Sequence, residues 1–382
     1  MGKKWFVALL MVVVMVCACW TGAVADEERK TFTSGDYQYA LLDDGTIEIT
    51  KYNGSADHLA IPATLDGKTV TAIGDRAFAG CSSLTSVSIP DSVTSIGDSA
   101  FSDCDSLTSI TIPDFVTQIG VNPFVFCSSL KSIFVSPDHP YFAVIDDVLF
   151  RKADKTLISY PEGKASSTYT IPQGIISIGD GAFFDNSSLK SITIPDSVIS
   201  IGDYAFFSCE SLTSISIPHS VTSIGDYAFS WCKSLTSITI PDSVTSIGDE
   251  AFSSCSSLTS VNIPDSVTSI GDSAFYSCSS LTSVNIPDSV TSIGDRAFCY
   301  CDSLTSVSIP DSVTAIGNRA FYYCDSLTSV SIPNSVTAIG DYAFGDCSNL
   351  TLTVPRNSYA LEYAKTNNIP YTYPDANDWL NN

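Results

Sequence analysis

The sequence predicts a repeat solenoid, in which each 23-residue coil has one short parallel β-strand, turns and a short helical turn. The first reason is a fixed period, because ten cysteines stand 23 residues from a neighbour, in runs from Cys81 to Cys127 and from Cys209 to Cys347. The second is an alternating apolar pattern that stops at Pro-Asp-Ser in most copies. The third is an Ala-Phe pair that recurs through eleven copies, with Pro123-Phe124 as the one departure.

Each copy begins with the short strand, as residues 255–278 illustrate. Leu258, Val261 and Ile263 follow an L-x-x-V-x-I pattern whose second half alternates, so apolar side chains lie on one face. Pro264-Asp265-Ser266 ends the strand, because proline lacks a ladder donor and Asp and Ser favour local turns.

The second half of each copy predicts the helical turn. Gly271-Asp272 supplies a turn and the helix N-cap, after which Ala274, Phe275 and Cys278 fall on the inward side. One coil cannot bury its inner face alone, whereas stacked coils cover one another with equivalent strands about 4.8 Å apart. At that spacing, eleven coils with caps predict a slab about 55 Å long.

Both ends depart from the repeat. Residues 26–58 alternate between turn signals, which predicts a β N-terminal cap on the solenoid at 59–354. Residues 355–382 predict a helical C-terminal cap, with Ser358 as a plausible N-cap.

The spacing is also broken inside the solenoid. The interval from Cys127 to Asn186 is one period plus 36 residues, which predicts an insertion at about 134–170. This segment is turn-rich and has a local basic cluster: Arg151, Lys152, Lys155 and Lys164. The insertion is either an excursion that binds a partner or a wider structural coil.

The first 25 residues predict a secretory signal peptide. A basic pair precedes an apolar run at 5–16, and Ala23-Val24-Ala25 provides the small-residue cleavage site. This run is short for a membrane span, and no second run of about 18 apolar residues follows, so we expect no transmembrane anchor. Val16-Cys17-Ala18-Cys19 resembles a degenerate lipobox, so a lipid anchor on Cys19 is an alternative to free secretion. Either way, we expect an extracellular or cell-surface location.

Charge limits the range of partners. The formal net charge is −23, and loss of residues 1–25 would leave 16 basic against 41 acidic residues, or −25. Such a chain repels nucleic acid and anionic lipid. Charged residues make up only 15% of the chain, so we expect an acidic surface that is rich in hydroxyl groups.

The repeat unit resembles a known family. Over about residues 59–354, the unit L-x-x-[IV]-x-I-P-x-S-V-T-x-I-G-x-x-A-F-x-x-C is similar to the BspA-like leucine-rich repeats of bacterial surface proteins. The resemblance implies a curved or flattened leucine-rich repeat solenoid, export, and adhesion to molecules of a host or a neighbouring cell.

The helical turn carries the best candidate site. If Ala, Phe and Cys face inward, the residue before Ala and the two after Phe share the outer face. Aromatic residues and arginine are enriched there, as they are at binding hot spots. These positions hold Tyr204, Phe207, Tyr227, Trp231, Tyr276, Arg296, Tyr300, Arg319, Tyr322, Tyr323 and Tyr342. The competing interpretation is that these side chains pack on one another and stiffen the stack.

The cysteine ladder predicts buried free thiols. Equivalent side chains about 4.8 Å apart point in parallel, whereas a disulfide needs Cβ atoms near 3.8 Å. Cys299 stands outside the ladder on the predicted outer face and is the candidate reactive thiol. It forms a Cys-x-Cys pair with Cys301 that lacks the further ligands of a zinc site.

We expect no cofactor, no metal and no catalysis. The recurrent Asp after Gly is explained by capping, with calcium as the alternative, and no D-x-D-x-D-G loop occurs. The three histidines lie in different contexts, and no nucleophile elbow, phosphate loop or H-E-x-x-H motif is present.

These observations predict a non-catalytic, adhesin-like protein that binds extracellular proteins or glycans, such as host matrix or neighbouring-cell surface molecules. Contacts spread over many coils would let weak sites act together. The alternative is a structural spacer of the cell envelope with no specific ligand.

Overall fold

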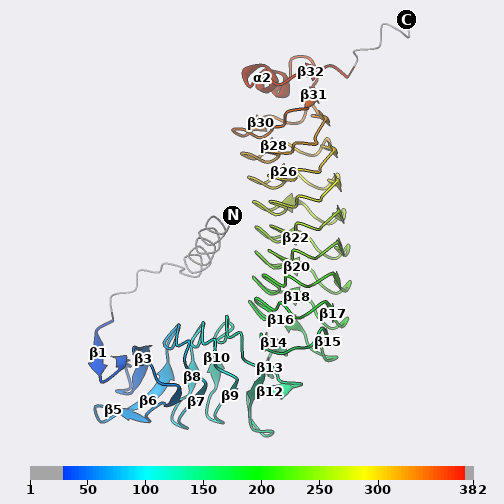
Figure 1. The fold of residues 1–382 in the computed structure, drawn as a ribbon. Helices are drawn as coiled ribbons and strands as arrows, with labels where there is room; N and C mark the ends of the chain where they lie inside the picture. The colour runs from blue at the N-terminus through cyan, green and yellow to red at the C-terminus, as the bar shows by residue number, and fades with distance from the viewer. Residues whose placement is uncertain (1–28, 375–382) are drawn as a thin grey trace, which may run out of the picture.

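The computed structural model describes residues 29–374 as a solenoid that is bent into an L (Figure 1). We call residues 31–134 the N-terminal arm, 135–167 the elbow and 168–374 the C-terminal arm. The predicted signal peptide and Cys19 lie outside the described residues, as does the end of the predicted C-terminal cap from residue 375. The predicted solenoid is confirmed. Its stack of coils changes direction at the elbow, a bend that the sequence did not predict.

The N-terminal arm begins with an antiparallel meander, whose last strand pairs in parallel with β6. One sheet has the order β1-β2-β3-β6-β8-β10, with β5 beside β6. The pairs β4–β7 and β9–β11 form the other side of the arm. The strands of this arm are β1 (Thr31–Ser34), β2 (Tyr37–Leu41), β3 (Ile47–Tyr52), β4 (His58–Ala60), β5 (Thr64–Leu65), β6 (Lys68–Ile73), β7 (Ser86–Ser88), β8 (Ser95–Ile96), β9 (Ser109–Thr111), β10 (Gln118–Ile119) and β11 (Ser132–Phe134).

The C-terminal arm has two parallel sheets, so each coil contributes two strands and not the single strand we predicted. The first sheet contains β15 (Thr168–Thr170), β17 (Ser191–Thr193), β19 (Ser214–Ser216), β21 (Ser237–Thr239), β23 (Ser260–Asn262), β25 (Ser283–Asn285), β27 (Ser306–Ser308), β29 (Ser329–Ser331), β31 (Thr351–Thr353) and β32 (Tyr371–Thr372). The second contains β16 (Ser177–Ile178), β18 (Ser200–Ile201), β20 (Ser223–Ile224), β22 (Ser246–Ile247), β24 (Ser269–Ile270), β26 (Ser292–Ile293), β28 (Ala315–Ile316) and β30 (Ala338–Ile339). The extra strand comes from the recurrent Ser-Ile or Ala-Ile pair, which is too short to show a period of its own.

The far end of the C-terminal arm is covered by a short helix, α2 (Tyr359–Thr366). It begins at Ser358, whose side chain accepts a hydrogen bond from the backbone N–H of Leu361. Ala360, Leu361 and Ala364 of α2 are buried with the core of this arm. The helix therefore shields the last coil from water.

The elbow is a meander of β12 (Phe142–Ile145), β13 (Val148–Arg151) and β14 (Thr156–Ser159), which pairs in parallel with β16. In β13, Val148 and Phe150 belong to the core of the C-terminal arm, whereas Leu149 belongs to that of the N-terminal arm. In β14, Leu157 belongs to the core of the C-terminal arm and Ile158 to that of the N-terminal arm. Because alternate side chains of a strand point to opposite faces, these strands are sandwiched between the two cores.

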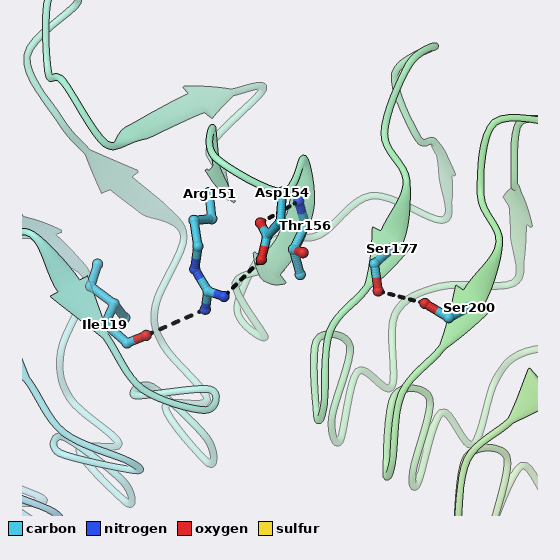
Figure 2. A network of polar contacts seen from close by, with 6 residues as sticks. All are labelled: Ile119, Arg151, Asp154, Thr156, Ser177 and Ser200. Atoms are coloured by element: carbon cyan, nitrogen blue, oxygen red, sulfur yellow. Dashed lines mark hydrogen bonds and ion pairs between the residues drawn. The ribbon is translucent and has the colours of Figure 1, made fainter.

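Polar contacts also join the arms at the elbow (Figure 2). The Arg151 guanidinium donates to Asp154 (Nη1 to Oδ2, 3.0 Å) and to the backbone carbonyl oxygen of Ile119 (3.5 Å), so it caps the end of β10. Asn122 Nδ2 donates to the carbonyl oxygen of Gly181, and its Oδ1 accepts from Ser159 Oγ at 3.1 Å. These bonds favour the structural interpretation of the insertion over the partner-binding one.

Two more of the four basic side chains of the insertion also form polar contacts within the elbow. Lys152 Nζ donates to the carbonyl oxygen of His139 at 2.6 Å, and Lys164 Nζ pairs with Asp147 at 2.7 Å. Lys155 has a left-handed backbone in the β13–β14 connection and is exposed. The predicted basic cluster is therefore mostly engaged within the molecule.

Candidate binding surface

The segment that we predicted as a helical turn is a succession of turns. The N–H groups of Ser273 and Phe275 donate to carbonyl oxygens of the next coil at 2.7 and 2.8 Å. Those of Ala274 and Tyr276 donate within their own coil. Because every second N–H group serves the neighbouring coil, the segment cannot form the i to i−4 bonds of an α-helix.

The recurrent Gly-Asp pair has a different role from the predicted N-cap. The Asp249 carboxylate accepts a hydrogen bond at 2.7 Å from the backbone N–H of Asp272, and Asp272 does the same for Asp295. The carboxylates thus form a ladder between coils. The adjoining glycines pack on it, since a Cβ at Gly271 would lie 2.7 Å from Asp249 Oδ1 and 2.8 Å from Gly248 C.

The cysteines of the ladder are free in the structure, and most of their thiols donate to a backbone carbonyl of the preceding coil. Cys278 Sγ, for example, lies 3.2 Å from the Phe252 oxygen. Burial raises the pKa of the Cys278 thiol to about 12. These side chains therefore act as buried polar fillers that join coils.

Two of the three predicted outer positions have unusual backbone. The residue before Ala and the second residue after Phe have positive φ, as in Arg296 (φ 55°), Arg319 (54°), Tyr300 (60°) and Tyr323 (57°). Gly181 and Gly80 occupy these positions in other coils. A bulky residue in the left-handed region costs about 1–2 kcal/mol relative to the right-handed region, so a side chain at this position needs another reason to be there.

The remaining position, directly after Phe, is buried in several coils. Phe207 is 6% exposed there and Cys299 is 2% exposed, so the predicted exposure of both side chains is wrong. Burial raises the pKa of the Cys299 thiol to about 11, which also argues against a reactive thiolate. Ser230 and Ser253 are buried at the same repeat position, a signal that an alignment of the copies contains.

The predicted stripe divides into two clusters. The elbow cluster has a buried centre of Phe184, Tyr204 and Phe207. Packed against it are the partly buried Val125, Phe126, Tyr227 and Trp231. Tyr204 is only 5% exposed, so its predicted place on the outer surface is wrong.

The cause is the bend. Phe126 from the N-terminal arm meets Phe184 from the C-terminal arm edge-on at 4.9 Å, and Tyr204 stacks on Tyr227 at 4.6 Å. Sequence reasoning missed Val125, Phe126 and Phe184, although Phe184 stands 23 residues before Phe207. In the elbow cluster, the side chains pack on one another, which agrees with the interpretation that they stiffen the stack.

The second group, the tyrosine cluster, lies towards the far end of the C-terminal arm. Its members are Tyr276, Tyr300, Tyr322, Tyr323 and Tyr342. The exposed fractions of Tyr300, Tyr323 and Tyr342 are 36%, 38% and 60%. Between the two clusters, the coil with Glu250 has serines at both positions after Phe. The tyrosine cluster is therefore a separate, open surface.

The tyrosine cluster encloses a pocket of about 350 Å³. Tyr276, Tyr300, Tyr322, Arg296 and Arg319 line it, with Glu250 at one end and Cys299 in its wall. The Arg319 guanidinium lies over the Tyr322 and Tyr342 rings, 5.8 and 5.9 Å from their centroids. A hydrogen bond to Asp346 raises the pKa of Tyr322 to about 12. The pocket thus offers aromatic walls and two cations.

Within the described part of the chain, no group of three or more His, Cys, Asp or Glu side chains is placed to hold a metal ion. None of the helices described there is long and apolar enough to cross a bilayer.

Comparison with known proteins gives one family. A family model for the BspA type leucine rich repeat region, in six copies, matches residues 52–166, 158–281 and 268–367. A comparison with curated proteins finds no match.

Solved structures of similar proteins come from several bacteria. A leucine rich cell surface protein from Faecalibacterium prausnitzii is 34% identical, over 89% of this chain and 98% of that one, with a TM-score of 0.54. A leucine-rich repeat protein from Eubacterium ventriosum is 25% identical, over 83% and 94%, also with a TM-score of 0.54. One from Bacteroides ovatus is 29% identical, over 90% and 99%, with a TM-score of 0.46. The similarity extends over most of the chain.

Proposed function

Because the chain belongs to the BspA-type leucine-rich repeat family, we propose that it is a non-catalytic surface or secreted protein that binds extracellular proteins or glycans. We place its adhesive surface on the tyrosine cluster. The cell-surface description of the similar Faecalibacterium protein supports the location. Export through a signal peptide at residues 1–25, with Cys19 as an alternative lipid anchor, is part of the same proposal.

One observation carries this proposal. Tyr300, Tyr323 and Tyr342 are exposed side chains on left-handed backbone. At the repeat position of Tyr300 and Tyr323, most other coils have Gly, Ser or Asp. Their aromatic contacts are with one another and with neighbouring rings, for example Tyr300 stacked on Tyr323 at 5.3 Å. Strained residues that the core does not need are typical of functional sites, and tyrosine is enriched at binding hot spots.

The test uses this backbone conformation to keep the fold intact. In Tyr300→Gly/Tyr323→Gly, both rings are lost and glycine suits both backbone positions. Ser254→Gly/Ser277→Gly is the matched control, because these serines have φ of 59° and 58° at the same repeat position. Binding would be measured by surface plasmon resonance against immobilised matrix proteins and mucin glycans. We expect the tyrosine variant to lose at least tenfold in affinity while the serine variant binds like the wild type.

Two outcomes would contradict the proposal. Equal binding by both variants would remove the tyrosine cluster from the adhesive surface. No binding by the wild type to any member of the panel would favour the envelope spacer, an idea that the packed rings of the elbow cluster support.

A further inference from the structure

We propose that the pocket in the tyrosine cluster binds a carboxylate side chain of an acidic protein segment, with Arg296 and Arg319 as the anion ligands. This inference rests on the proposed function, because it names the chemistry of the ligand at the same surface. Its distinctive feature is two cations side by side on a chain of net charge −23.

The two arginines occupy equivalent positions in neighbouring coils. Both side chains are exposed, and within residues 29–374 neither forms an ion pair with an acid. Both have left-handed backbone, at the position that is Gly181 in another coil. Adjacent coils hold like charges close together, which is unfavourable unless an anion bridges them. The guanidinium groups are therefore available to a ligand.

The row of aspartates is interrupted at this place. In the C-terminal arm, the residue after the repeat glycine is Asp in every coil except at Asn318, which precedes Arg319 in the chain. The backbone N–H of Arg296 donates to the Asn318 carbonyl oxygen at 2.8 Å.

Asn318 keeps the ladder, because its N–H donates to Asp295 at 2.7 Å and its Oδ1 accepts from Asp341 at 2.9 Å. One negative charge is thus removed beside the two arginines without a change of shape, which makes the potential at the pocket more positive.

The remaining acid of the pocket is already engaged. Glu250 Oε1 accepts a hydrogen bond from the Tyr227 hydroxyl at 3.0 Å, and burial raises the pKa of Glu250. One oxygen of this carboxylate is thus already engaged by a neighbouring side chain, and Glu250 forms no ion pair with either arginine. A ligand carboxylate would receive paired N–H groups from a planar guanidinium, the geometry that arginine provides and lysine does not.

The ring arrangement favours a protein segment over a glycan. Tyr276 and Tyr300 are nearly perpendicular, with an interplanar angle of 83° and centroids 5.5 Å apart, and Tyr300 and Tyr322 meet at 82°. Rings that meet at such angles form slots that fit single side chains. Clusters of arginine among tyrosines are a recurrent means of recognising acidic peptide motifs.

The test is fluorescence anisotropy with two labelled decapeptides, one alternating Glu and Tyr and one alternating Gln and Tyr, at physiological ionic strength. We expect the wild type to bind the Glu peptide at least tenfold more tightly than the Gln peptide. Arg296→Gln/Arg319→Gln should abolish this preference. The matched control is Arg76→Gln, which changes an exposed arginine with φ 54° at the same repeat position in the N-terminal arm. It should keep the preference.

Three results would overturn the inference. The first is the absence of any preference for the Glu peptide in the wild type, and the second is a preference that survives in the double variant. The third is arginine-dependent binding of a sulfated heparin hexasaccharide that is tighter than that of the Glu peptide, which would make the site a glycan site. If the inference fails while Tyr300→Gly/Tyr323→Gly still loses binding to a matrix protein, the proposed function stands without it.

Discussion

The close approach of neighbouring coils at the repeat glycine predicts that Gly294→Ala is strongly destabilising. A Cβ at Gly294 would lie 2.7 Å from Asp272 Oδ1 and from the Gly271 oxygen, and 2.8 Å from the Asp272 nitrogen. Two of these atoms are backbone and cannot rotate away. Ordinary contact begins at 3.4 Å, so the coils would have to separate by about 0.7 Å.

That separation would also weaken the bonds between these coils. The Gly294 N–H donates to the Ile270 oxygen at 3.1 Å, and the Asp295 N–H to Asp272 Oδ1 at 2.7 Å. Overpacking costs about 1–3 kcal/mol and each of the two weakened hydrogen bonds about 1 kcal/mol, so we expect a loss of about 3–5 kcal/mol in the free energy of unfolding.

Urea unfolding followed by far-UV circular dichroism would measure this loss. Ser292→Ala is the matched control, since Ser292 is half-buried in β26 of the same coil and its side chain forms no hydrogen bond within residues 29–374. A Gly294→Ala midpoint equal to that of the control would refute the reasoning, because the glycine would then not set the coil spacing.

Three further predictions concern the elbow and the turns. Asn122→Ala should lower the free energy of unfolding by about 2 kcal/mol, since it leaves the buried Gly181 oxygen and Ser159 hydroxyl unpaired; thermal unfolding beside the wild type measures this. Burial, with the carboxylates of Asp185, Asp105 and Asp103, raises the pKa of Glu162 to about 8. As the pH rises, Glu162 loses its proton in the unfolded chain before it does so in the folded one. The free energy of unfolding should therefore fall by roughly 2–4 kcal/mol between about pH 4.5 and 8. Glu162→Gln should flatten that fall in urea titrations across this pH range, and an unchanged slope would exclude Glu162 as its cause. Ser273→Gly, at φ 54°, should raise the free energy of unfolding by up to about 1 kcal/mol, whereas Ser269→Gly in β24 should lower it. Equal changes in urea titrations of the two variants would contradict the backbone argument.

The sequence was informative wherever a property belongs to one coil. The inward residues of the repeat, such as Leu258, Val261, Phe275 and Cys278, are all buried, because a strict period places them against their own copies. The second strand was missed because its two residues are too few to show a period, and the turn ladder was missed because it exists only through bonds to the next coil. A pattern of single residues does not show whether an N–H group serves its own coil or its neighbour.

The candidate site was only partly predictable for a related reason. Tyr204 is buried and Tyr300 is exposed, although both lie at outer positions of the same repeat. Tyr204 is covered because the elbow brings Phe126 of the N-terminal arm onto Phe184, which contacts the Tyr204 ring. Tyr300 is remote from the bend and stays exposed. The repeat pattern does not show where the stack of coils bends. It therefore placed Tyr204 and Tyr300 on the same outer surface.

The strands β13 and β14 have a consequence for cooperativity. A stack of coils is held together by contacts between neighbours, so it can fray from an end or separate at a weak coil. Leu149 lies between Val148 and Phe150 in one strand yet packs into the opposite core. Withdrawing β13 would therefore remove side chains from both cores at once. The two arms should unfold as one thermodynamic unit, and the angle at which the tyrosine cluster is presented should persist until both arms are lost.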